Sequence, residues 1–180
     1  MKANIALIKG DGIGPEVIDA ALLVLDKASN IFNHDFHYTE VLAGGIAIDT
    51  FGSPLPDISL QVLKNSDAVL MGALGGPKWD NCTERPEKAL LAIRKGLGLY
   101  ANLRPAKLFS SMKAVCPLKN AENIDLIVVR ELTGGIYYGE RGLRRGKMGL
   151  EAFDTESYGE LEIERIAQAH RRLAQCVQKN

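Results

Sequence analysis

The chain has 180 residues, of which 46% are hydrophobic and 24% charged, an ordinary composition for a globular protein in water. Lysine plus arginine and aspartate plus glutamate both number 22, so no bulk charge favours nucleic acid or an anionic membrane as partner. No apolar run approaches the roughly 20 residues of a membrane helix, and the first residues are typical of a strand, not a signal peptide.

Three cysteines, Cys82, Cys116 and Cys176, lie far apart in the sequence and lack any metal-ligand spacing. An odd number of widely separated cysteines favours free thiols over a disulfide framework. We therefore expect a reducing, cytoplasmic environment.

The first half of the chain alternates apolar runs with amphipathic segments. Residues 4–9 and 67–74 predict buried strands, and residues 36–42 alternate as a strand does. Apolar residues recur at helical spacing over residues 15–28, and a second helix is predicted over residues 57–64. Strands that alternate with helices predict a parallel sheet covered by helices.

The second half is less regular. A helix is predicted at 87–95 and a strand at 99–104, and the clearest strand of the chain is predicted at 125–132. Residues 134–158 have many glycines and little periodicity, which predicts a long loop or a projecting hairpin arm. Apolar spacing from Glu160 onward predicts one amphipathic helix.

A glycine loop with the sequence G-D-G-I-G-P-E occupies residues 10–16, between the first strand and the first helix. Its glycines at 10, 12 and 14 do not match the dinucleotide fingerprint G-x-G-x-x-G, and no clear acidic residue ends a strand about 20 positions later. On loop chemistry alone, a cofactor contact and a tight turn that needs positive φ are equally favoured.

Four further segments follow in order: G-A-L-G-G-P-K-W-D (72–80), R-P-E-K-A-L-L-A-I-R-K (85–95), Y-A-N-L-R-P-A-K (100–107) and V-R-E-L-T-G-G-I-Y-Y-G-E (129–140). Together with the glycine loop they resemble the β-decarboxylating dehydrogenases, the isocitrate and isopropylmalate dehydrogenase family. The motifs look most like the isopropylmalate branch. The resemblance runs from Ile5 to about Ile166.

This resemblance implies an α/β fold with two domains around a cleft, distinct from a Rossmann domain and present here only in part. Residues 1–99 would begin the NAD-side domain. Residues 100–180 would begin the substrate and dimerisation domain, with the arm at about 134–158. A homodimer that pairs through this arm is implied as well.

The implied activity is the NAD-dependent oxidative decarboxylation of (2R,3S)-3-isopropylmalate to 2-oxo-4-methylpentanoate in leucine biosynthesis, with Mg²⁺ or Mn²⁺. In the family, the metal-binding aspartates and a lysine base follow the point where this chain stops. No metal ligand is therefore expected within the chain, and the chain alone is expected to be inactive. The alternatives are a tartrate- or isocitrate-type member of the family and a truncated module that only binds or dimerises.

Three arginines match the substrate clamp of the family: Arg94, Arg104 and Arg130. A malate-type substrate carries two carboxylates, and a planar, always charged guanidinium binds a carboxylate through two hydrogen bonds. A lone arginine is more often a solvated surface charge. Arg130, however, ends an apolar strand, where a charge needs a functional reason.

Tyr137 matches the catalytic tyrosine of the family, a general acid that protonates the substrate carbon after carbon dioxide leaves. Tyr138 stands beside it in the sequence. Because neighbours on a strand point to opposite faces, we expect only one of the two to enter the cleft, with Tyr138 packing elsewhere.

Substrate choice is expected to depend on Glu87, Leu90 and Leu91, which share one face of the helix that follows Pro86. The leucines would form an apolar patch for an isopropyl group. Isocitrate would place a carboxylate there, and burying that charge against leucine is costly. On spacing alone, both leucines could instead belong to the core.

The resemblance also implies the cofactor contacts. Ile13 would lie near the adenosine of NAD, and the loop that leads to Glu87 would pass along the cofactor. The expected contacts in this loop are Gly75, Gly76, Pro77, Lys78, Trp79, Asp80 and Glu87. The basic run R-G-L-R-R-G-K at 141–147 is interpreted as solvated or interfacial charge, because it lacks the interleaved aromatic residues of a nucleic-acid site.

Overall fold

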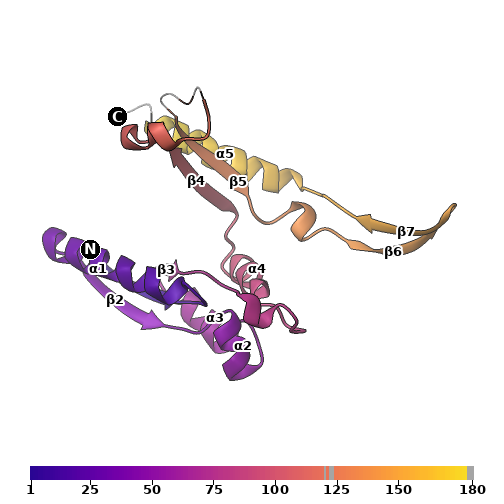
Figure 1. Cartoon of the computed structure of the whole chain (residues 1–180), viewed down its shortest axis with the longest axis horizontal. Coiled ribbons are helices and arrows are strands. Elements are labelled where there is room, and N and C mark those ends of the chain that lie inside the picture. The colour runs from indigo at the N-terminus through magenta and orange to yellow at the C-terminus, as the bar shows by residue number, and fades with distance from the viewer. Residues whose placement is uncertain (120, 122–123, 178–180) are drawn as a thin grey trace. The chain divides into compact units, whose positions relative to one another are not determined.

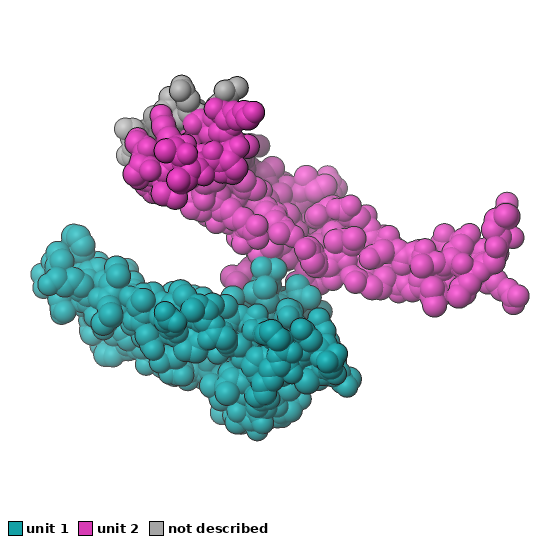
Figure 2. All heavy atoms as spheres, viewed as in Figure 1, with its two compact units in different colours: residues 1–98 teal, residues 99–180 magenta. Residues whose placement is uncertain are grey.

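The computed structural model describes residues 1–119, 121 and 124–177, which divide into two compact units (Figures 1 and 2). The first unit spans Met1–Gly98 and the second Leu99–Asn180. Within the described residues, the first unit contains a three-stranded parallel sheet and the second contains two antiparallel strand pairs.

Strand β1 (Lys2–Ile8) is the centre of the first sheet. It pairs in parallel with β2 (Asp35–Glu40) on one side and with β3 (Ala68–Met71) on the other. Residues 5–8 are all buried, and since successive residues of a strand face opposite sides, both faces of β1 are covered. The predicted parallel sheet is therefore confirmed.

The helices of the first unit connect these strands and cover them. They are α1 (Gly14–Phe32), α2 (Gly45–Phe51), α3 (Asp57–Lys64) and α4 (Glu87–Gly96). The predicted helices at 15–28, 57–64 and 87–95 are confirmed. Helix α2 was not predicted, because it has only seven residues and begins at a glycine, which is a poor helix former. The core joins the sheet to the helices through Ile8, Leu63, Ala89 and Ile93.

The turn between β1 and α1 depends on the glycines of the G-D-G-I-G-P-E loop. Gly10 has a φ of +75°, and a Cβ there would collide with the carbonyl of Ala73. A Cβ on Gly14 would collide with the carbonyl of Lys9. The positive-φ turn, one of the two interpretations of this loop from its sequence, is therefore present.

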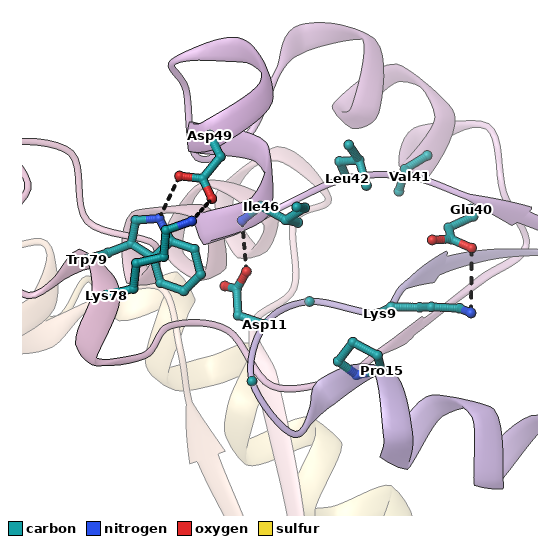
Figure 3. A pocket seen from close by; sticks show the side chains of 12 residues that line it. Lys9, Asp11, Pro15, Glu40, Val41, Leu42, Ile46, Asp49, Lys78 and Trp79 are labelled. Carbon is teal, nitrogen blue, oxygen red and sulfur yellow. Dashed lines mark hydrogen bonds and ion pairs between the residues drawn. The ribbon is translucent and has the colours of Figure 1, made fainter.

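Asp11 joins three segments of the first unit through its carboxylate, which lies in a side chain that is only 4% exposed. The carboxylate accepts hydrogen bonds from the backbone N–H groups of Gly45 at 2.7 Å and Gly75 at 2.8 Å. It also accepts one from the N–H of Ile46 at 2.8 Å (Figure 3). Gly45 and Ile46 begin α2, whose first N–H groups have no partner inside the helix. Asp11 therefore caps α2 from a distant loop and holds the loop at Gly75 beside it.

In the second unit, β4 (Ala101–Lys107) and β5 (Asp125–Glu131) form an antiparallel pair. Helix α5 (Glu160–Val177) packs along β5. Strands β6 (Arg141–Gly146) and β7 (Gly149–Asp154) form a hairpin within the segment 134–158 that was predicted as a loop or an arm (Figure 1). Three short 3-10 helices complete the described chain: η1 (Pro77–Trp79), η2 (Ser110–Val115) and η3 (Gly135–Tyr137).

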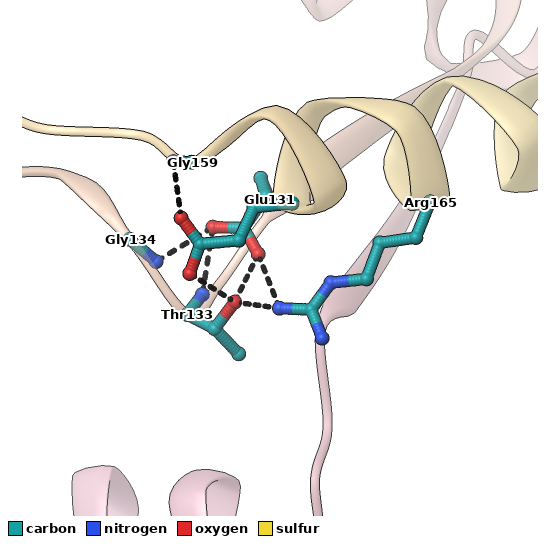
Figure 4. Close-up of polar contacts among 6 residues, drawn as sticks. Glu131, Thr133, Gly134, Gly159 and Arg165 are labelled. Carbon is teal, nitrogen blue, oxygen red and sulfur yellow. Dashed lines mark hydrogen bonds and ion pairs between the residues drawn. The ribbon is translucent and has the colours of Figure 1, made fainter.

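Glu131, the last residue of β5, has a side chain only 9% exposed. Its carboxylate accepts hydrogen bonds from the N–H of Thr133 at 2.7 Å, the N–H of Gly134 at 2.8 Å and the Thr133 hydroxyl (Figure 4). The guanidinium of Arg165, on α5, lies 3.4 Å away. Burial alone would raise the pKa of Glu131, but these hydrogen bonds outweigh it and hold the pKa below its ordinary value of 4.5.

Replacing Asp11 with alanine should destabilise the first unit by about 3 kcal/mol, because buried N–H groups lose their charged acceptor. Urea unfolding followed by the fluorescence of Trp79, the single tryptophan, measures this change. Asp26→Ala removes an exposed carboxylate and is the matched control, with an expected change within about 0.5 kcal/mol. Equal stability of the Asp11 variant and the parent chain would contradict the assigned role.

Glu131 should make the stability of the chain depend on pH. Because its folded pKa lies below the ordinary value, its contribution is complete above about pH 4.5 and is lost as the pH falls through the lowered folded value. Glu131→Gln cannot ionise and should be less stable than the parent at neutral pH. The difference in unfolding free energy, measured by denaturant titration at several pH values, should shrink in acid. A difference that stays constant across the acid range would refute this linkage.

Candidate functional site

A hollow of about 330 Å³ lies beside the glycine loop in the first unit (Figure 3). The glycine loop, the end of β2, helix α2 and η1 line it. The hollow lies at the carboxyl ends of parallel strands β1 and β2, the edge at which open α/β sheets generally bind ligands. The Lys9 ammonium in its lining, however, already has two acidic partners: it lies 3.8 Å from Glu40, which also lines the hollow, and 2.9 Å from Asp19, which does not.

Two residues of the expected cofactor loop, Lys78 and Trp79, turn toward helix α2 (Figure 3). The Lys78 ammonium lies 2.5 Å from the Asp49 carboxylate, and the Trp79 indole N–H donates to the same carboxylate at 3.1 Å. These two hydrogen bonds lower the pKa of Asp49. A Cβ on Gly45 would strike the Trp79 ring. Helix α2 thus fixes this end of the loop.

The beginning of the same loop lies against helix α4. Gly75 has a φ of +98°, and a Cβ there would lie 2.9 Å from Oε1 of Glu87. Gly76 precedes η1, Pro77 begins it and Asp80 follows it. Ile13 precedes α1 with its side chain 57% exposed, two residues after the carboxylate that binds Gly75. Among the expected cofactor contacts, Gly75 is therefore bound to Asp11, two residues before Ile13, and lies against the carboxylate of Glu87.

Helix α4 presents two different faces. Its core face carries Ala89 and Ile93, both buried. The other face carries four residues that were predicted to contact the substrate: Glu87, Leu90, Leu91 and Arg94. Leu90 and Leu91 are half-buried, and the core cluster forms without them. The predicted shared face is confirmed, and the alternative that both leucines are core residues gains no support.

Arg104 and Arg130 lie on the same face of the β4–β5 pair. In the antiparallel register, Arg104 is opposite Val128 and Arg130 is opposite Asn102, which makes the arginines diagonal neighbours. Such neighbours are about 7–8 Å apart. Nε of Arg104 donates to Oδ1 of Asn102 at 2.7 Å. Two guanidinium groups at this spacing can bind the carboxylates of one small substrate.

Arg130 lies near the end of the apolar strand β5, as predicted. The apolar residues Leu126 and Val128 on its face are 48% and 50% exposed within the described chain. The guanidinium carbon of Arg130 lies 5.5 Å from the centre of the Tyr137 ring, a cation–π arrangement.

Tyr137 ends the short helix η3, and Tyr138 follows it. The strand that we assumed around the two tyrosines is therefore wrong. Gly135 has a φ of +73°, a value foreign to strands, and this residue starts the turn. Strand alternation cannot choose between the tyrosines, whereas the stacking of Arg130 on Tyr137 distinguishes them.

Charges of the hairpin arm are paired within it. Arg144 lies 3.1 Å from Glu151 and stacks on Phe153 at 5.3 Å, and Arg141 lies 3.8 Å from Asp154. The basic run is therefore partly neutralised by β7. The other side chains of the arm include Leu143 and Leu150, which are 67% and 74% exposed.

Three acidic residues that hold these loops were not predicted: Asp11, Asp49 and Glu131. For two of them the sequence has a signal. Asp11 stands between two glycines, and Glu131 precedes the pair Gly134 and Gly135. Glycine backbone is unshielded by a side chain, so a nearby carboxylate can reach its N–H groups.

Over residues 1–119, 121 and 124–177, no three His, Cys, Asp or Glu side chains are grouped so that they could hold a metal ion. None of the helices in these residues has the length and apolar character needed to cross a membrane. Cys82, Cys116 and Cys176 are free thiols.

Comparison with known proteins gives the family. A family model described as isocitrate/isopropylmalate dehydrogenase matches residues 4–180. A 3-isopropylmalate dehydrogenase of Clostridium acetobutylicum is 56% identical over 170 residues, which are 91% of this chain and 47% of that protein. The Bacillus subtilis protein of the same name is 51% identical over 172 residues, 92% of this chain and 47% of that protein. The chain thus spans about half the length of the curated relatives it matches.

Solved structures agree with this assignment. An isocitrate dehydrogenase of Methylococcus capsulatus aligns with a TM-score of 0.77 and 29% identity, over 97% of this chain and 48% of that one. A β-decarboxylating dehydrogenase of Thermococcus kodakarensis aligns with a TM-score of 0.70 and 33% identity, over 97% and 46%. The fold is accordingly the α/β fold of these dehydrogenases. With its ordered motifs and its match over residues 4–180, the chain belongs to the isocitrate/isopropylmalate dehydrogenase family.

Proposed function

We propose that this chain provides part of the active site of an NAD-dependent dehydrogenase. The reaction is the oxidative decarboxylation of (2R,3S)-3-isopropylmalate to 2-oxo-4-methylpentanoate in leucine biosynthesis. The observation that carries the proposal is the grouping of Arg104, Arg130 and Tyr137 in the second unit. Carboxylate-binding groups beside a phenol fit a substrate that is first held by its charges and then protonated on carbon.

Substrate recognition is divided between charge and shape. Arg104 and Arg130 would bind carboxylates, with Arg94 on helix α4 as the third arginine of the clamp. Leu90 and Leu91, on the same face of α4 as Arg94, would receive the isopropyl group. The carboxylate of isocitrate in that position would lose its hydration without gaining a partner, which favours the apolar substrate.

The cofactor would lie along Gly75, Gly76 and η1. These two glycines have no side chains, so a ligand can approach their backbone closely, and Asp11 holds the N–H of Gly75 in place. When bound, NAD accepts the hydride from the carbon that carries the hydroxyl group. We expect Mg²⁺ or Mn²⁺ in the whole enzyme, but the described residues offer no ligand set for it.

Tyr137 would supply the proton. Loss of carbon dioxide leaves negative charge on the substrate, and the carbon must gain a proton to give the product. The phenol of Tyr137 is a suitable donor, and the Arg130 guanidinium over its ring offsets the negative charge left on the oxygen. Arg130 would thus both bind the substrate and assist the acid.

Two further features belong to this proposal. The exposed Leu143 and Leu150 give the arm an apolar surface, which would pair with the arm of a second copy in a homodimer.

The three free thiols favour a reducing compartment, and we place the enzyme in the cytoplasm.

The direct test is an assay of the complete enzyme, that is, this chain together with a polypeptide that supplies the other half of the relatives' length. NADH formation from 3-isopropylmalate with NAD and Mg²⁺ or Mn²⁺ supports the proposal. A preference for isocitrate or tartrate would assign the chain to another type of this family. Absence of NADH with all three substrates would favour a module that only binds or dimerises, and turnover by the chain alone would show that it builds a metal site by itself.

In the complete enzyme, Tyr137→Phe should lower kcat by about 10²- to 10⁴-fold, because packing is kept and the proton donor is lost. The KM for isopropylmalate should change little, since the arginines remain. Tyr138→Phe is the matched control and should keep nearly normal kinetics. A Tyr138 variant more impaired than the Tyr137 variant would reverse the assignment of the acid.

Replacing Leu90 with serine and Leu91 with asparagine should lower kcat/KM for isopropylmalate, because two aliphatic contacts are lost. The decrease should correspond to a loss of about 2–4 kcal/mol in transition-state binding. Steady-state kinetics measures this change. Ala92→Ser, an exposed position on the same helix, serves as control. Unchanged kcat/KM in the double variant would show that the leucines do not contact the substrate.

A further inference from the structure

The turn that carries Tyr137 is held from two sides. On one side, the Glu131 carboxylate binds the N–H groups of Thr133 and Gly134 (Figure 4). On the other side lies the segment that enters α5. There the N–H of Gly135 donates to the carbonyl of Ser157 at 2.8 Å. The Tyr158 ring covers the glycines so closely that a Cβ on Gly134 would lie 2.8 Å from its Cδ1.

Arg165 connects this clamp to the rest of the second unit. Its guanidinium contacts the Thr133 hydroxyl and lies 3.4 Å from the Glu131 carboxylate. The same guanidinium stacks over the ring of Tyr100 at 4.8 Å. The backbone of Tyr100 in turn accepts a hydrogen bond from Leu132 at 2.9 Å. The carboxylate, the hydroxyl and the guanidinium therefore fix the end of β5 against helix α5.

Glu131 itself lies away from the substrate-binding arginines. Arg130 and Glu131 are neighbours on β5, so their side chains leave the strand on opposite faces. Arg130 stacks on Tyr137, whereas Glu131 faces α5. The carboxylate is connected to Tyr137 through the turn between them, whose N–H groups it binds.

We propose that Glu131, assisted by Thr133 and Arg165, is a positioning residue that sets Tyr137 against Arg130. This inference rests on the proposed role of Tyr137 as the proton donor. The consecutive glycines Gly134 and Gly135 give the turn many accessible conformations. The Glu131 carboxylate stabilises one of these conformations because it binds two N–H groups of the turn. Selection matters because a displacement of about 1 Å in a reacting group can cost about 10²-fold in rate.

The test begins with Glu131→Gln in the complete enzyme. An amide cannot accept as many charge-assisted hydrogen bonds, so kcat should fall by about 10²-fold while the KM for isopropylmalate stays within about twofold. Thr133→Val, which removes the hydroxyl, should lower kcat. Thr133→Ser, which keeps the hydroxyl, should have a kcat close to that of the parent. Glu164→Gln is the matched control: it removes an exposed carboxylate from the same helix as Arg165 and should leave kinetics unchanged.

A double-mutant cycle with Tyr137→Phe then shows whether Glu131 acts through Tyr137. If it does, Glu131→Gln should change kcat by less than about twofold when Tyr137 is already phenylalanine. Full additivity of the two losses would overturn the inference. So would a raised KM with unchanged kcat, which would place the effect on Arg130 instead.

A readout without catalysis separates this inference from the proposed function. In the 180-residue chain with labelled tyrosine, the Tyr137 ring resonances should shift toward unstructured values in Glu131→Gln and stay in place in Glu164→Gln. Unmoved Tyr137 resonances in Glu131→Gln would overturn the positioning role. A normal kcat in Tyr137→Phe, combined with shifted resonances in Glu131→Gln, would instead reject the catalytic role of Tyr137 and keep the structural clamp.

Discussion

A buried carboxylate needs hydrogen-bond donors in place of water. In the first unit, this requirement at Asp11 determines where the glycine loop, the start of α2 and the loop at Gly75 come together. Asp11 is 4% exposed, and an unpaired carboxylate at that depth would cost several kcal/mol. The N–H groups of Gly45, Ile46 and Gly75 therefore cannot leave it without a large loss of stability. The start of α2 and the loop at Gly75 are both positioned relative to the glycine loop. The hydrogen-bonded group of Asp49, Lys78 and Trp79 is positioned with them.

The second unit uses the same device with one addition. Glu131 also binds backbone N–H groups near glycines, but a guanidinium from α5 joins it. A charge-assisted contact between helix α5 and the end of β5 fixes the conformation of the turn that follows. The glycines of that turn would otherwise allow several backbone conformations. In both units, an acidic side chain thus supplies the order that regular secondary structure does not supply in these loops.

The regular elements could be predicted from the sequence, whereas the loops could not. Apolar periodicity located β1, α1, α4 and the clearest strand, β5, because burial imposes a period on the sequence. It missed α2, which is short and begins at Gly45, and it failed at Tyr137, where Gly135 ends the strand-like conformation. Asp11 lies 34 and 64 residues from two of its partners, a distance over which no local pattern reports contact. Candidate substrate residues came from motif resemblance, and the shared face of Glu87, Leu90 and Leu91 followed from the helical period. The shared face of Arg104 and Arg130 became visible only with the register of β4 and β5.

The exposed face of the β4–β5 pair explains why two arginines there suit a dicarboxylate. Arg104 and Arg130 stand among Leu126 and Val128, which are about half exposed. A substrate that covers this face would displace water from apolar surface and lower the local dielectric constant. Each guanidinium–carboxylate contact would then strengthen, while a carboxylate without a guanidinium partner would be penalised. Recognition by charge and exclusion of water therefore act together, and Tyr137 lies beside the same guanidinium that the substrate would bind.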